Sequence, residues 1–423
     1  MGSEQQFKSI KGTRDLLPEE SARVRSVETT IHDVMNRWGY GEIRTPAFEQ
    51  TELFTRSVGE ESDIVTKQMY TFSDQSGTSL TLKPELTAPV MRAYIEHDMA
   101  RGGALTKLYY IDDLFRQERP QKGRLRQFRQ FGAEAIGSPH PEQDAEIVAL
   151  VYTILTEIGL DDITLHINSI GSDNSRNVFR HALVEFLTPH KSDLSETSQR
   201  RLQTNPLRIL DSKSEEEQKL LKNAPSILDY LDDDDRAHYE DVKHFLDRMN
   251  IPFAENKMMV RGLDYYTRTT FEITSPNVGA QDALCGGGRY DKLIEDLGGK
   301  QTPAVGFATG VERIMLAMEQ GDEDSDQKAP RVYVVAAGDA ARNAVLKLTM
   351  DLRAEGISAD FDSLRRSLKA QMREANRLSA SHAVIIGEKE LAAGTAQVKT
   401  LVSGEQDTLP LKEISSNLSS GQV

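Results

Sequence analysis

The chain has 423 residues, of which 38% are hydrophobic and 28% are charged, and this balance excludes a collagen-like or intrinsically disordered protein. Its one cysteine, Cys285, excludes an intrachain disulfide, and no apolar run approaches the roughly 18 residues that a membrane span needs. Because the N-terminus also lacks an apolar stretch of the signal-peptide type, we expect a cytoplasmic protein with no membrane partner.

The net charge of −15 taken alone argues against a nucleic-acid partner, and we expect no DNA partner, but the charge is unevenly distributed. Residues 331–423 carry 12 Lys and Arg against 11 Asp and Glu, whereas the remaining residues carry 39 against 55. Because phosphate attraction is screened within about 10 Å at ordinary salt, a local basic surface would still suffice to bind RNA.

Residues 1–330 are predicted to form an α+β domain. Residues 21–39 have the spacing of an amphipathic helix, and residues 265–273 are rich in the tyrosine, threonine and phenylalanine that favour antiparallel strands. Strands are expected at 106–116, 126–137, 163–169, 257–274 and 303–308. Residues 172–250 are highly charged, helical in pattern and poor in strand-forming residues, so we interpret them as a helical insertion into this domain.

A second domain is predicted at residues 331–423. The preceding segment, 321–330, is polar and acidic and ends in proline, as a linker does. After it, strand-like runs alternate with helical periodicity in the order 332–336, 340–355, 357–361, 363–378 and 383–386. Strands that alternate with helices indicate a small α/β domain with a largely parallel sheet.

The segment 115–130 is predicted to be a hairpin with a Pro- and Gly-containing loop, and it holds six basic residues and one acid. Guanidinium groups bind phosphate oxygens through two parallel hydrogen bonds, so the hairpin suits a polyphosphate or an RNA end. A solvated basic hairpin accounts for the charge equally well, and composition alone does not decide between the two.

Two further segments combine glycine with tyrosine. Arg261 and Gly262 precede Tyr265 and Tyr266, and because strand side chains alternate, these tyrosines are expected on opposite faces, one in the core and one at the surface. The three glycines at 286–288 allow either a close backbone approach to a ligand or a tight turn. The chain contains no P-loop, and a dinucleotide-binding motif is not supported.

The segment 303–314 runs from a strand of small residues into a helix that begins near Gly310, which places Arg313 in the first helical turn. A cation there opposes the helix dipole unless an anion lies nearby, and this favours a phosphate partner over a plain surface arginine. The nine histidines show no metal-binding spacing and Cys285 lacks a flanking base motif, so we expect neither a protein metal site nor a cysteine nucleophile.

In their order along the chain, these segments resemble the class II aminoacyl-tRNA synthetases, and in detail the histidyl-tRNA synthetase family. The hairpin at Arg116 resembles motif 2 of the class, residues 306–314 resemble motif 3, and residues 42–46 resemble motif 1, the dimerisation element. Residues 261–266 and 285–291 resemble two stretches specific to the histidine family. Two further matches are 10–15 and 205–211.

The resemblance implies a two-step reaction. ATP activates L-histidine to histidyl-adenylate and pyrophosphate, and the histidyl group then passes to the 3′-terminal adenosine of tRNA(His), releasing AMP. It also implies a homodimer, Mg²⁺ accompanying the ATP, an antiparallel catalytic sheet flanked by helices, and an anticodon-binding domain at residues 331–423.

The resemblance also implies a histidine pocket. The residues expected in it are Glu85, Thr87, Gln130, Glu134, Tyr265 and Tyr266. Glu85 and Thr87 would hold the α-amino group, since a carboxylate is the natural partner of an ammonium. Gln130 would lie near the substrate carboxylate, and Glu134 and Tyr266 would contact the imidazole. A site built on such hydrogen bonds rejects a non-bonding analogue by roughly 10⁴-fold or more.

The ATP and tRNA sites follow from the same resemblance. Arg116 and Arg261 are the expected catalytic residues, both in contact with the α-phosphate. Glu118 and Phe128 would frame the adenine, and Arg313 would hold the terminal phosphates or stack on the base. The expected contacts to the acceptor end of the tRNA are Arg119, Lys122, Arg124 and Arg126.

Two features differ from the family pattern or match it loosely. Lys83 and Leu86 stand where the family more often has arginine and glycine, which affects the expected fine positioning in the histidine pocket. In the second domain, basic residues spaced by four would form one stripe on a helix, either an RNA-phosphate face or a solvated face. They are Arg365, Lys369, Arg373 and Arg377.

Two alternative functions would place the chain in other classes of protein. A catalytically silent paralogue, the regulatory subunit of ATP phosphoribosyltransferase, shares this catalytic fold but typically lacks the anticodon domain and has eroded site motifs. Here residues 331–423 are present, and Arg116, Glu134, Arg261 and Tyr266 survive. A histidine-sensing module fused to a signalling protein is disfavoured by the short length and the absence of additional domains.

Overall fold

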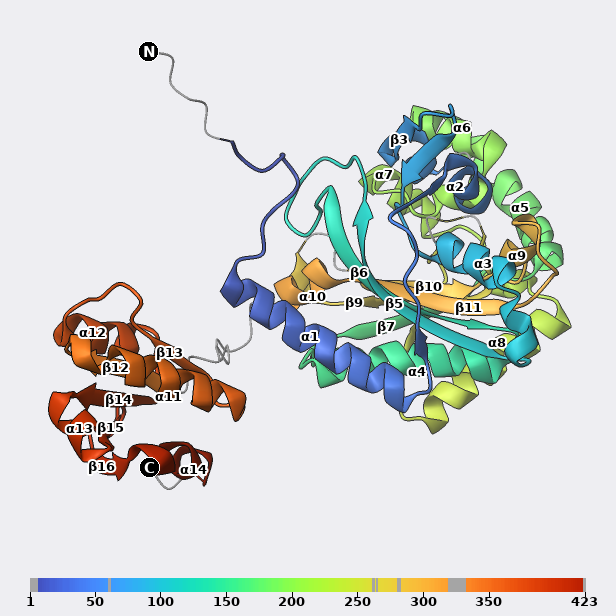
Figure 1. Cartoon of the computed structure of the whole chain (residues 1–423). Helices are drawn as coiled ribbons and strands as arrows, with labels where there is room; N and C mark the ends of the chain where they lie inside the picture. Colours follow the sequence, from blue (N-terminus) through green and yellow to red (C-terminus); the bar gives the residue numbers. More distant parts are fainter. Residues whose placement is uncertain are drawn as a thin grey trace, which may run out of the picture. The chain divides into compact units, whose positions relative to one another are not determined.

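The computed structural model describes residues 7–59, 62–260, 263, 265–279, 283–318 and 332–420 (Figure 1). The chain forms two compact units, Met1–Glu323 and Asp324–Val423, and each is described by itself. Within these described ranges, no helix combines the length and the apolar character needed to cross a membrane.

An eight-stranded sheet with the order β1-β5-β6-β11-β10-β9-β7-β8 forms the centre of the first unit. Its strands are β1 (Gly41–Glu42), β5 (Thr106–Phe115), β6 (Gln127–Ile136), β7 (Thr164–Ser169), β8 (Ala254–Glu255), β9 (Thr267–Thr274), β10 (Ala283–Arg289) and β11 (Ala304–Gly310). The pairing is antiparallel except at the two edges, where β1–β5 and β7–β8 are parallel. The predicted α+β class with an antiparallel catalytic sheet is confirmed.

The strand expected over 257–274 is wrong in its first half, because β9 begins only at Thr267. Before it, the Asn256 side chain accepts a hydrogen bond from the backbone N–H of Met258 at 3.2 Å, and the Met259 N–H donates to the Asn256 carbonyl at 3.0 Å. This asparagine-led turn competes with strand pairing and ends the short strand β8.

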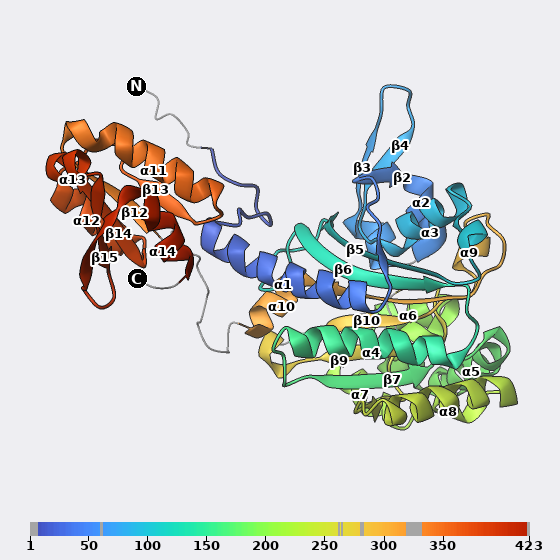
Figure 2. The same cartoon turned by 60° about the horizontal axis from the view of Figure 1, so that its bottom comes forward.

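Helices α1 (Pro18–Arg37) and α4 (Pro141–Glu157) lie side by side and cover one face of the sheet (Figures 1 and 2). In α1, Val24, Val27, Ile31 and Val34 are buried at the spacing of one helical face. The other helices of this part are α2 (Thr51–Val58), α3 (Thr87–Glu96), α9 (Leu293–Asp296) and α10 (Val311–Met318). A small sheet of order β2-β4-β3 joins β2 (Phe48–Gln50), β4 (Ser79–Leu82) and β3 (Tyr70–Ser73).

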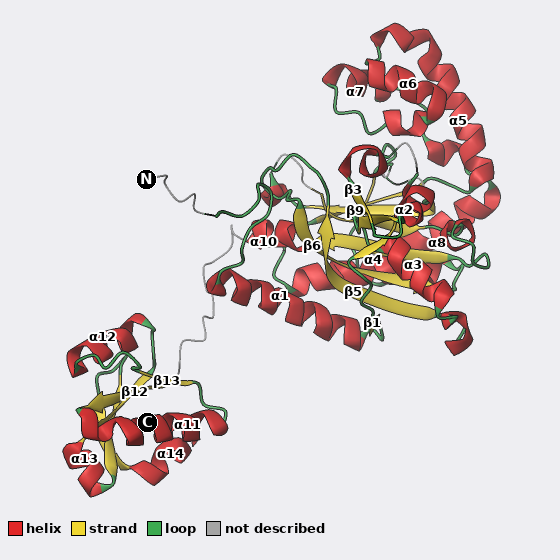
Figure 3. Ribbon diagram, turned by 45° about the horizontal axis from the view of Figure 1, so that its top comes forward, coloured by secondary structure: helices red, strands yellow, loops and turns green. Residues whose placement is uncertain are grey.

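The segment between β7 and β8 is helical (Figure 3). Its α-helices are α5 (Asp173–Leu187), α6 (Glu196–Thr204), α7 (Glu215–Leu221) and α8 (Asp233–Arg248). The acidic run at 232–235 is a helix start, because the Asp232 side chain caps α8 by accepting from the N–H of Asp235 at 2.9 Å. Helix α8 packs against α4 and β9, so the helical segment is joined to the sheet.

The second unit contains a five-stranded sheet of order β13-β12-β14-β15-β16. Its strands are β12 (Val332–Ala337), β13 (Ala359–Phe361), β14 (His382–Gly387), β15 (Thr395–Thr400) and β16 (Gln406–Pro410), and its helices are α11 (Arg342–Ala354), α12 (Leu368–Arg377), α13 (Glu388–Ala393) and α14 (Ile414–Ser420). The first three strands are parallel, as predicted, and β15 and β16 add an antiparallel hairpin that was not predicted.

The helix predicted over 363–378 is shorter than expected, because α12 begins at Leu368. Arg365 has φ +57, a left-handed conformation that cannot continue a helix, and Ser367 is extended. The basic stripe therefore loses Arg365 and retains Lys369, Arg373 and Arg377 on the helix.

Candidate active site

A cavity of about 480 Å³ lies in the first unit, bounded by the β5–β6 hairpin, β10, β11 and the helical segment after β7. Its lining includes ten of the residues predicted from the sequence. They are Glu85, Thr87, Arg116, Glu118, Arg124, Phe128, Gln130, Tyr265, Tyr266 and Arg313. The fold thus brings together side chains from segments that are far apart in the chain.

Glu134 lies on β6 and borders the cavity at Gly306, its register partner on β11. Its carboxylate accepts hydrogen bonds from the hydroxyls of Thr87 (2.9 Å), Tyr110 (3.0 Å) and Tyr290. Burial raises the pKa of Glu134 to about 8, and these hydrogen bonds only partly offset that rise. A buried carboxylate with neutral partners is suited to accept a hydrogen bond from a ligand N–H group.

Gly306 is required by this arrangement. A Cβ at this position would lie 1.8 Å from Glu134 Oε2, 2.6 Å from the Ala133 carbonyl oxygen and 2.7 Å from the Tyr290 hydroxyl. The small residues of the segment 303–310 therefore make room for a carboxylate, which the sequence pattern alone did not indicate.

Glu85 lies two residues before the first residue of α3, and its carboxylate accepts from the backbone N–H groups of Thr87 (2.8 Å) and Ala88 (3.0 Å). These amides belong to the first helical turn, so the side chain satisfies groups that have no partner within the helix. Burial raises the pKa of Glu85 to about 7, although both amides and Arg116 oppose the rise. Through the hydroxyl of Thr87, the surroundings of Glu85 connect to Glu134.

The prediction that Tyr265 and Tyr266 point to opposite sheet faces is wrong. Both residues precede β9, both line the cavity, and their ring centroids are 4.7 Å apart. Tyr290 completes the cluster, at 5.4 Å from the Tyr265 ring and 6.3 Å from the Tyr266 ring. Gly288 faces this cluster, since a Cβ there would lie 2.9 Å from Tyr266 Cδ1.

Arg116 extends from the hairpin into the cavity and is fixed on two sides. Its Nε donates to the Pro84 carbonyl at 2.8 Å, and its guanidinium lies over the Phe128 ring at 5.2 Å from the centroid. Burial lowers the pKa of Arg116, and the nearby carboxylates of Glu118 and Glu85 oppose that effect. An arginine held in this way presents its Nη groups as a ready anion-binding fork.

Arg313 lies near the start of α10, as predicted, and its Nη1 donates to the Ala283 carbonyl. The hairpin loop approaches the same helix, because a Cβ on Gly123 would lie 3.0 Å from Leu316. Gln130 lies on β6 opposite Asp112 and Gly310 and faces the cavity between Glu134 and the hairpin loop.

The four basic loop residues predicted to receive tRNA occupy two different environments. Arg119 and Lys122 are exposed. Arg124 Nη1 lies 3.4 Å from Glu118 Oε2, and Arg126 Nε donates to the Glu118 carbonyl at 3.3 Å. Arg124 and Arg126 therefore also hold Glu118, and the Arg126 N–H donates to the Gly12 carbonyl at 2.6 Å, which ties the N-terminal segment to the loop.

Lys83, one of the departures from the family pattern, lies outside the cavity lining. It is 1% exposed, donates to Asp112 Oδ2 at 2.5 Å and donates to the Thr45 carbonyl at 3.1 Å. Its ammonium thus connects β5 to the segment that resembles motif 1. Leu86, the second departure, is buried in the core beside α3.

Several cavity residues were missed or lie outside the described ranges. Arg201, Arg208 and Asp211, from the segment after β7, line the cavity. The match at 205–211 is a sequence signal for Arg208 and Asp211, whereas Arg201 lies outside it and has none. Tyr110, which holds Glu134, had no signal at all, since strand tyrosines are common. The predicted catalytic residue Arg261 is not among the residues that the structure describes.

Comparison with known proteins agrees with this geometry. Residues 12–314 match the family model for histidyl-tRNA synthetase, and residues 331–420 match that for the anticodon binding domain. The histidine–tRNA ligase of Geobacillus thermodenitrificans is 48% identical over 416 residues, 97% of this chain and 98% of that protein. That of Chloroherpeton thalassium is 47% identical over 412 residues, 96% of each chain.

Among solved structures, apo histidyl-tRNA synthetase from S. aureus is similar with a TM-score of 0.84 and 40% identity. The match covers 98% of this chain and 100% of that one. The close, full-length relatives are ligases, which decides against the regulatory paralogue. The chain therefore belongs to the histidyl-tRNA synthetase family of class II aminoacyl-tRNA ligases.

Proposed function

We propose that this chain activates histidine with ATP and transfers it to tRNA(His), using the cavity as its active site. The observation that carries the proposal is the division of the cavity lining by charge. One part holds the buried acid Glu85 and borders the buried Glu134 at Gly306, and another holds Arg116 and Arg313. The first part suits the ammonium and imidazole of histidine, and the second suits the phosphates of ATP.

In the histidine part, the α-amino group would lie at Glu85 and Thr87, and the substrate carboxylate near Gln130. The imidazole would lie between Glu134 and the tyrosines Tyr265 and Tyr266, so that one ring N–H donates to the carboxylate. Each carboxylate oxygen has two lone pairs, so the existing hydrogen bonds of Glu85 and Glu134 leave acceptor capacity for the substrate.

In the ATP part, a carboxylate oxygen of histidine would attack the α-phosphorus, the bond to the bridging oxygen would break, and pyrophosphate would leave. Such transfers depend on positioning and charge neutralisation more than on covalent help. Arg116 and Arg261 would contact the α-phosphate, and Arg313 would hold the terminal phosphates. Glu118 and Phe128 would frame the adenine.

ATP would enter as its Mg²⁺ complex, in which the ion neutralises phosphate charge. In the ranges that the structure describes, no cluster of three or more His, Cys, Asp or Glu side chains could hold a metal by itself. Mg²⁺ is commonly held by one or two carboxylates together with substrate phosphates, and Glu312 lines the cavity next to Arg313. This carboxylate fits an ion that arrives with its nucleotide.

The proposal extends to the partners and to the organisation of the chain. The exposed Arg119 and Lys122, with Arg124 and Arg126, would receive the acceptor end of the tRNA. Residues 331–423 would bind the anticodon, residues 172–250 would form an insertion within a catalytic domain of residues 1–330, and two chains would form a cytoplasmic dimer. A monomeric mass in solution would contradict the dimer.

The decisive experiment is ATP–pyrophosphate exchange with each of the twenty amino acids, followed by charging of tRNA(His). Exchange with histidine alone and subsequent charging is the expected result. An absence of exchange with every amino acid would refute the proposal. The variant Arg261→Ala should lose exchange while histidine binding, measured by calorimetry, is retained; equal loss of both would contradict the role of Arg261 at the α-phosphate.

A further inference from the structure

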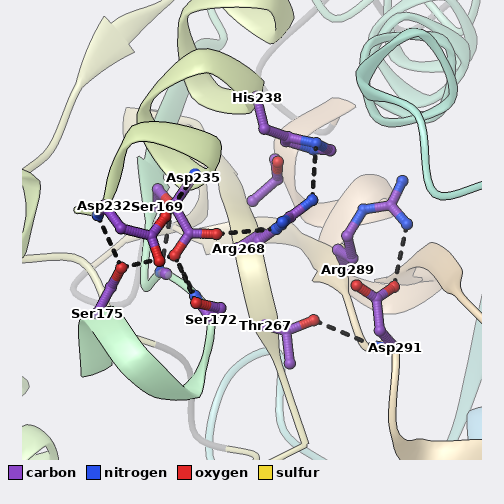
Figure 4. A network of polar contacts seen from close by, with 12 residues as sticks. Ser169, Ser172, Ser175, Asp232, Asp235, His238, Thr267, Arg268, Arg289 and Asp291 are labelled. Atoms are coloured by element: carbon purple, nitrogen blue, oxygen red, sulfur yellow. Dashed lines mark hydrogen bonds and ion pairs between the residues drawn. The ribbon is translucent and has the colours of Figure 1, made fainter. Parts of the chain in front are cut away.

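The two segments that carry the pocket tyrosines are each adjoined by an arginine fixed within a polar network (Figure 4). Arg268 follows Tyr266 by two residues, and Arg289 directly precedes Tyr290. Neither arginine lines the cavity. Their contacts are instead with α4, with α8 and with the segment that connects β7 to α5.

Arg268 adopts a conformation that its residue type disfavours. Its φ of +50 lies in the left-handed region, where a side chain with a Cβ is strained. At this point the β9–β10 register shifts, since Gly288 pairs with Thr270 whereas Arg289 pairs with Thr267. The chain therefore bulges at residues 268–269, two residues after Tyr266, and a bulge redirects the side chains near it.

The bulge is fixed through both the backbone and the side chain of Arg268. The backbone N–H donates to the Gly171 carbonyl at 2.9 Å, and the carbonyl accepts from Ile170 at 2.8 Å. The side-chain Nε donates to Asp235 Oδ1 at 2.9 Å, and Nη1 lies 3.4 Å from His238 Nδ1. Asp235 and His238 lie one turn apart on α8, so the helical segment holds the bulge.

Asp235 is itself held rigidly. Its Oδ2 accepts from the N–H and hydroxyl of Ser172, both at 2.7 Å, and from the hydroxyl of Ser175 at 2.6 Å. The carboxylate is 1% exposed, and although burial raises its pKa, the serine hydrogen bonds and the Arg268 charge bring the pKa below its usual value. Asp235 is therefore a fixed anion rather than a flexible surface acid.

His238 joins this anchor to the one beside Tyr290. Its Nε2 lies 2.7 Å from Asp144 Oδ2 on α4, and the same oxygen accepts from Thr269 at 2.6 Å and from Arg289 Nε at 3.2 Å. With Nε2 donating to Asp144, Nδ1 is left to accept from Arg268. One network thus reaches both tyrosine-bearing segments.

We propose that Arg268 is a positioning residue for histidine recognition, through which α8 sets the orientation of Tyr265 and Tyr266. The inference rests on the proposed role of these tyrosines in the histidine pocket. Without the Asp235 contact, the strained bulge relaxes and the two rings leave their places in the cavity. A shift of about 1 Å at such a site costs up to roughly 10²-fold in rate or affinity.

The test is histidine-dependent ATP–pyrophosphate exchange by Arg268→Asn. Asparagine tolerates the left-handed conformation but lacks the guanidinium, so the variant removes the anchor without adding backbone strain. We expect the KM for histidine to rise by about 10- to 100-fold while the KM for ATP changes by less than about twofold. Arg268→Lys keeps a cation facing Asp235 and should show an intermediate KM for histidine. If the asparagine variant does not fold, the lysine variant tests the proposal in its place.

The matched control is Lys243→Ala on the same helix. Lys243 Nζ lies 2.8 Å from Glu255 on β8 and 2.8 Å from Glu240, so its removal also weakens the attachment of α8. It does not touch the bulge, and the KM for histidine should be unchanged. Equal increases in this KM in Lys243→Ala and Arg268→Asn would overturn the proposal, because general loosening of α8 would then suffice.

Tyr266→Phe separates this inference from the function on which it rests. If Tyr266→Phe raises the KM for histidine and both Arg268 variants leave it unchanged, the positioning role of Arg268 is wrong, whereas the proposed histidine pocket is supported. If Tyr266→Phe leaves this KM unchanged, the assignment of Tyr266 to the imidazole fails first. A rise in all three variants, graded from lysine to asparagine at position 268, supports the inference.

Discussion

Glu134 and Asp144 are two fully enclosed carboxylates of the catalytic unit with opposite surroundings. Asp144 on α4 faces Arg289 and His238, and although burial would raise its pKa, the Arg289 charge and the His238 hydrogen bond hold that pKa below its usual value. Glu134 on β6 faces hydroxyl groups, and burial raises its pKa to about 8. Of these two carboxylates, Arg289 contacts Asp144 and the adjacent Tyr290 contacts Glu134.

The difference separates a structural site from a binding site. Asp144 has its counter-charge within the protein, so its charge is balanced before any ligand arrives. Glu134 has hydrogen-bond donors but no internal counter-charge among the described residues, and a cationic or N–H-bearing ligand would supply what is missing. Buried acids therefore identify a ligand site by the kind of partner that they lack, and not by burial alone.

The largest expected effect is on stability and concerns the balanced acid. Asp144→Asn leaves the buried guanidinium of Arg289 without its main counter-charge, and breaking such a pair costs about 3–5 kcal/mol. The free energy of unfolding from urea denaturation should fall by that amount. A normal stability together with a raised KM would reverse the assignments of the two carboxylates.

Glu134→Gln should show the opposite behaviour. The amide keeps the volume but removes the charge, and hydrogen bonds to charged groups contribute about 1.5–3 kcal/mol, so kcat/KM for histidine should fall by roughly 10- to 100-fold. Unfolding should change little, or the variant should become slightly more stable, because a desolvated acid has been removed. Steady-state exchange kinetics and urea denaturation of the same samples measure both quantities.

The pH dependence sharpens the comparison further. Burial raises the pKa of Glu134 to about 8 and that of Glu85 to about 7, from an ordinary value of 4.5. The folded, ligand-free protein thus holds protons that the unfolded chain releases, so these groups stabilise it below pH 4.5, and this contribution is lost as the pH rises towards 8.

Histidine binding should follow the opposite trend, because it requires the ionised carboxylates. Its affinity should rise by up to about tenfold per pH unit below the pKa of Glu134. Calorimetry between pH 6 and 8.5 measures this rise, and Glu134→Gln provides the control for titration of the free amino acid. An identical slope in both proteins would exclude Glu134 as the titrating group.

The smallest effect is expected in the exposed hairpin loop. Arg119→Ala combined with Lys122→Ala removes two surface cations that contact neither acid. The KM for tRNA in the charging reaction should rise by about tenfold at low salt, less at high salt, and pyrophosphate exchange should be unchanged. A matching loss in both reactions would place these residues in the activation step.

Sequence patterns located most of the sheet because the motifs coincide with strands, and β5, β6, β7 and β11 begin and end within a few residues of expectation. They also located most of the cavity lining. They failed at Tyr265 and Tyr266, where alternation was assumed but the strand begins later and a left-handed Arg268 follows. No local periodicity reports such a bulge, since it depends on Asp235 in another element.

The polar network was invisible to sequence reasoning for a related reason. His238 and Asp144 are 94 residues apart, and Arg289 and Asp144 are 145 residues apart, so each pair exists only through packing. The partner of His238 on α8 is Asp144, which lies on α4, outside the helical segment between β7 and β8. Tertiary contacts of this kind are visible only in the folded structure, whereas hairpins and glycine-rich turns can be recognised from the local sequence.

The glycine at position 306 also limits how this pocket could be redesigned for another amino acid. A side chain there would meet not only Glu134 but also the Ala133 carbonyl, which no substitution on the neighbouring strand removes. Shortening Glu134 would enlarge the pocket, yet a side chain at position 306 would still meet the Ala133 carbonyl. Redesign for another amino acid can therefore enlarge the pocket at Glu134 but cannot fill it with a side chain at position 306. New contacts would come from the segments that carry the tyrosines.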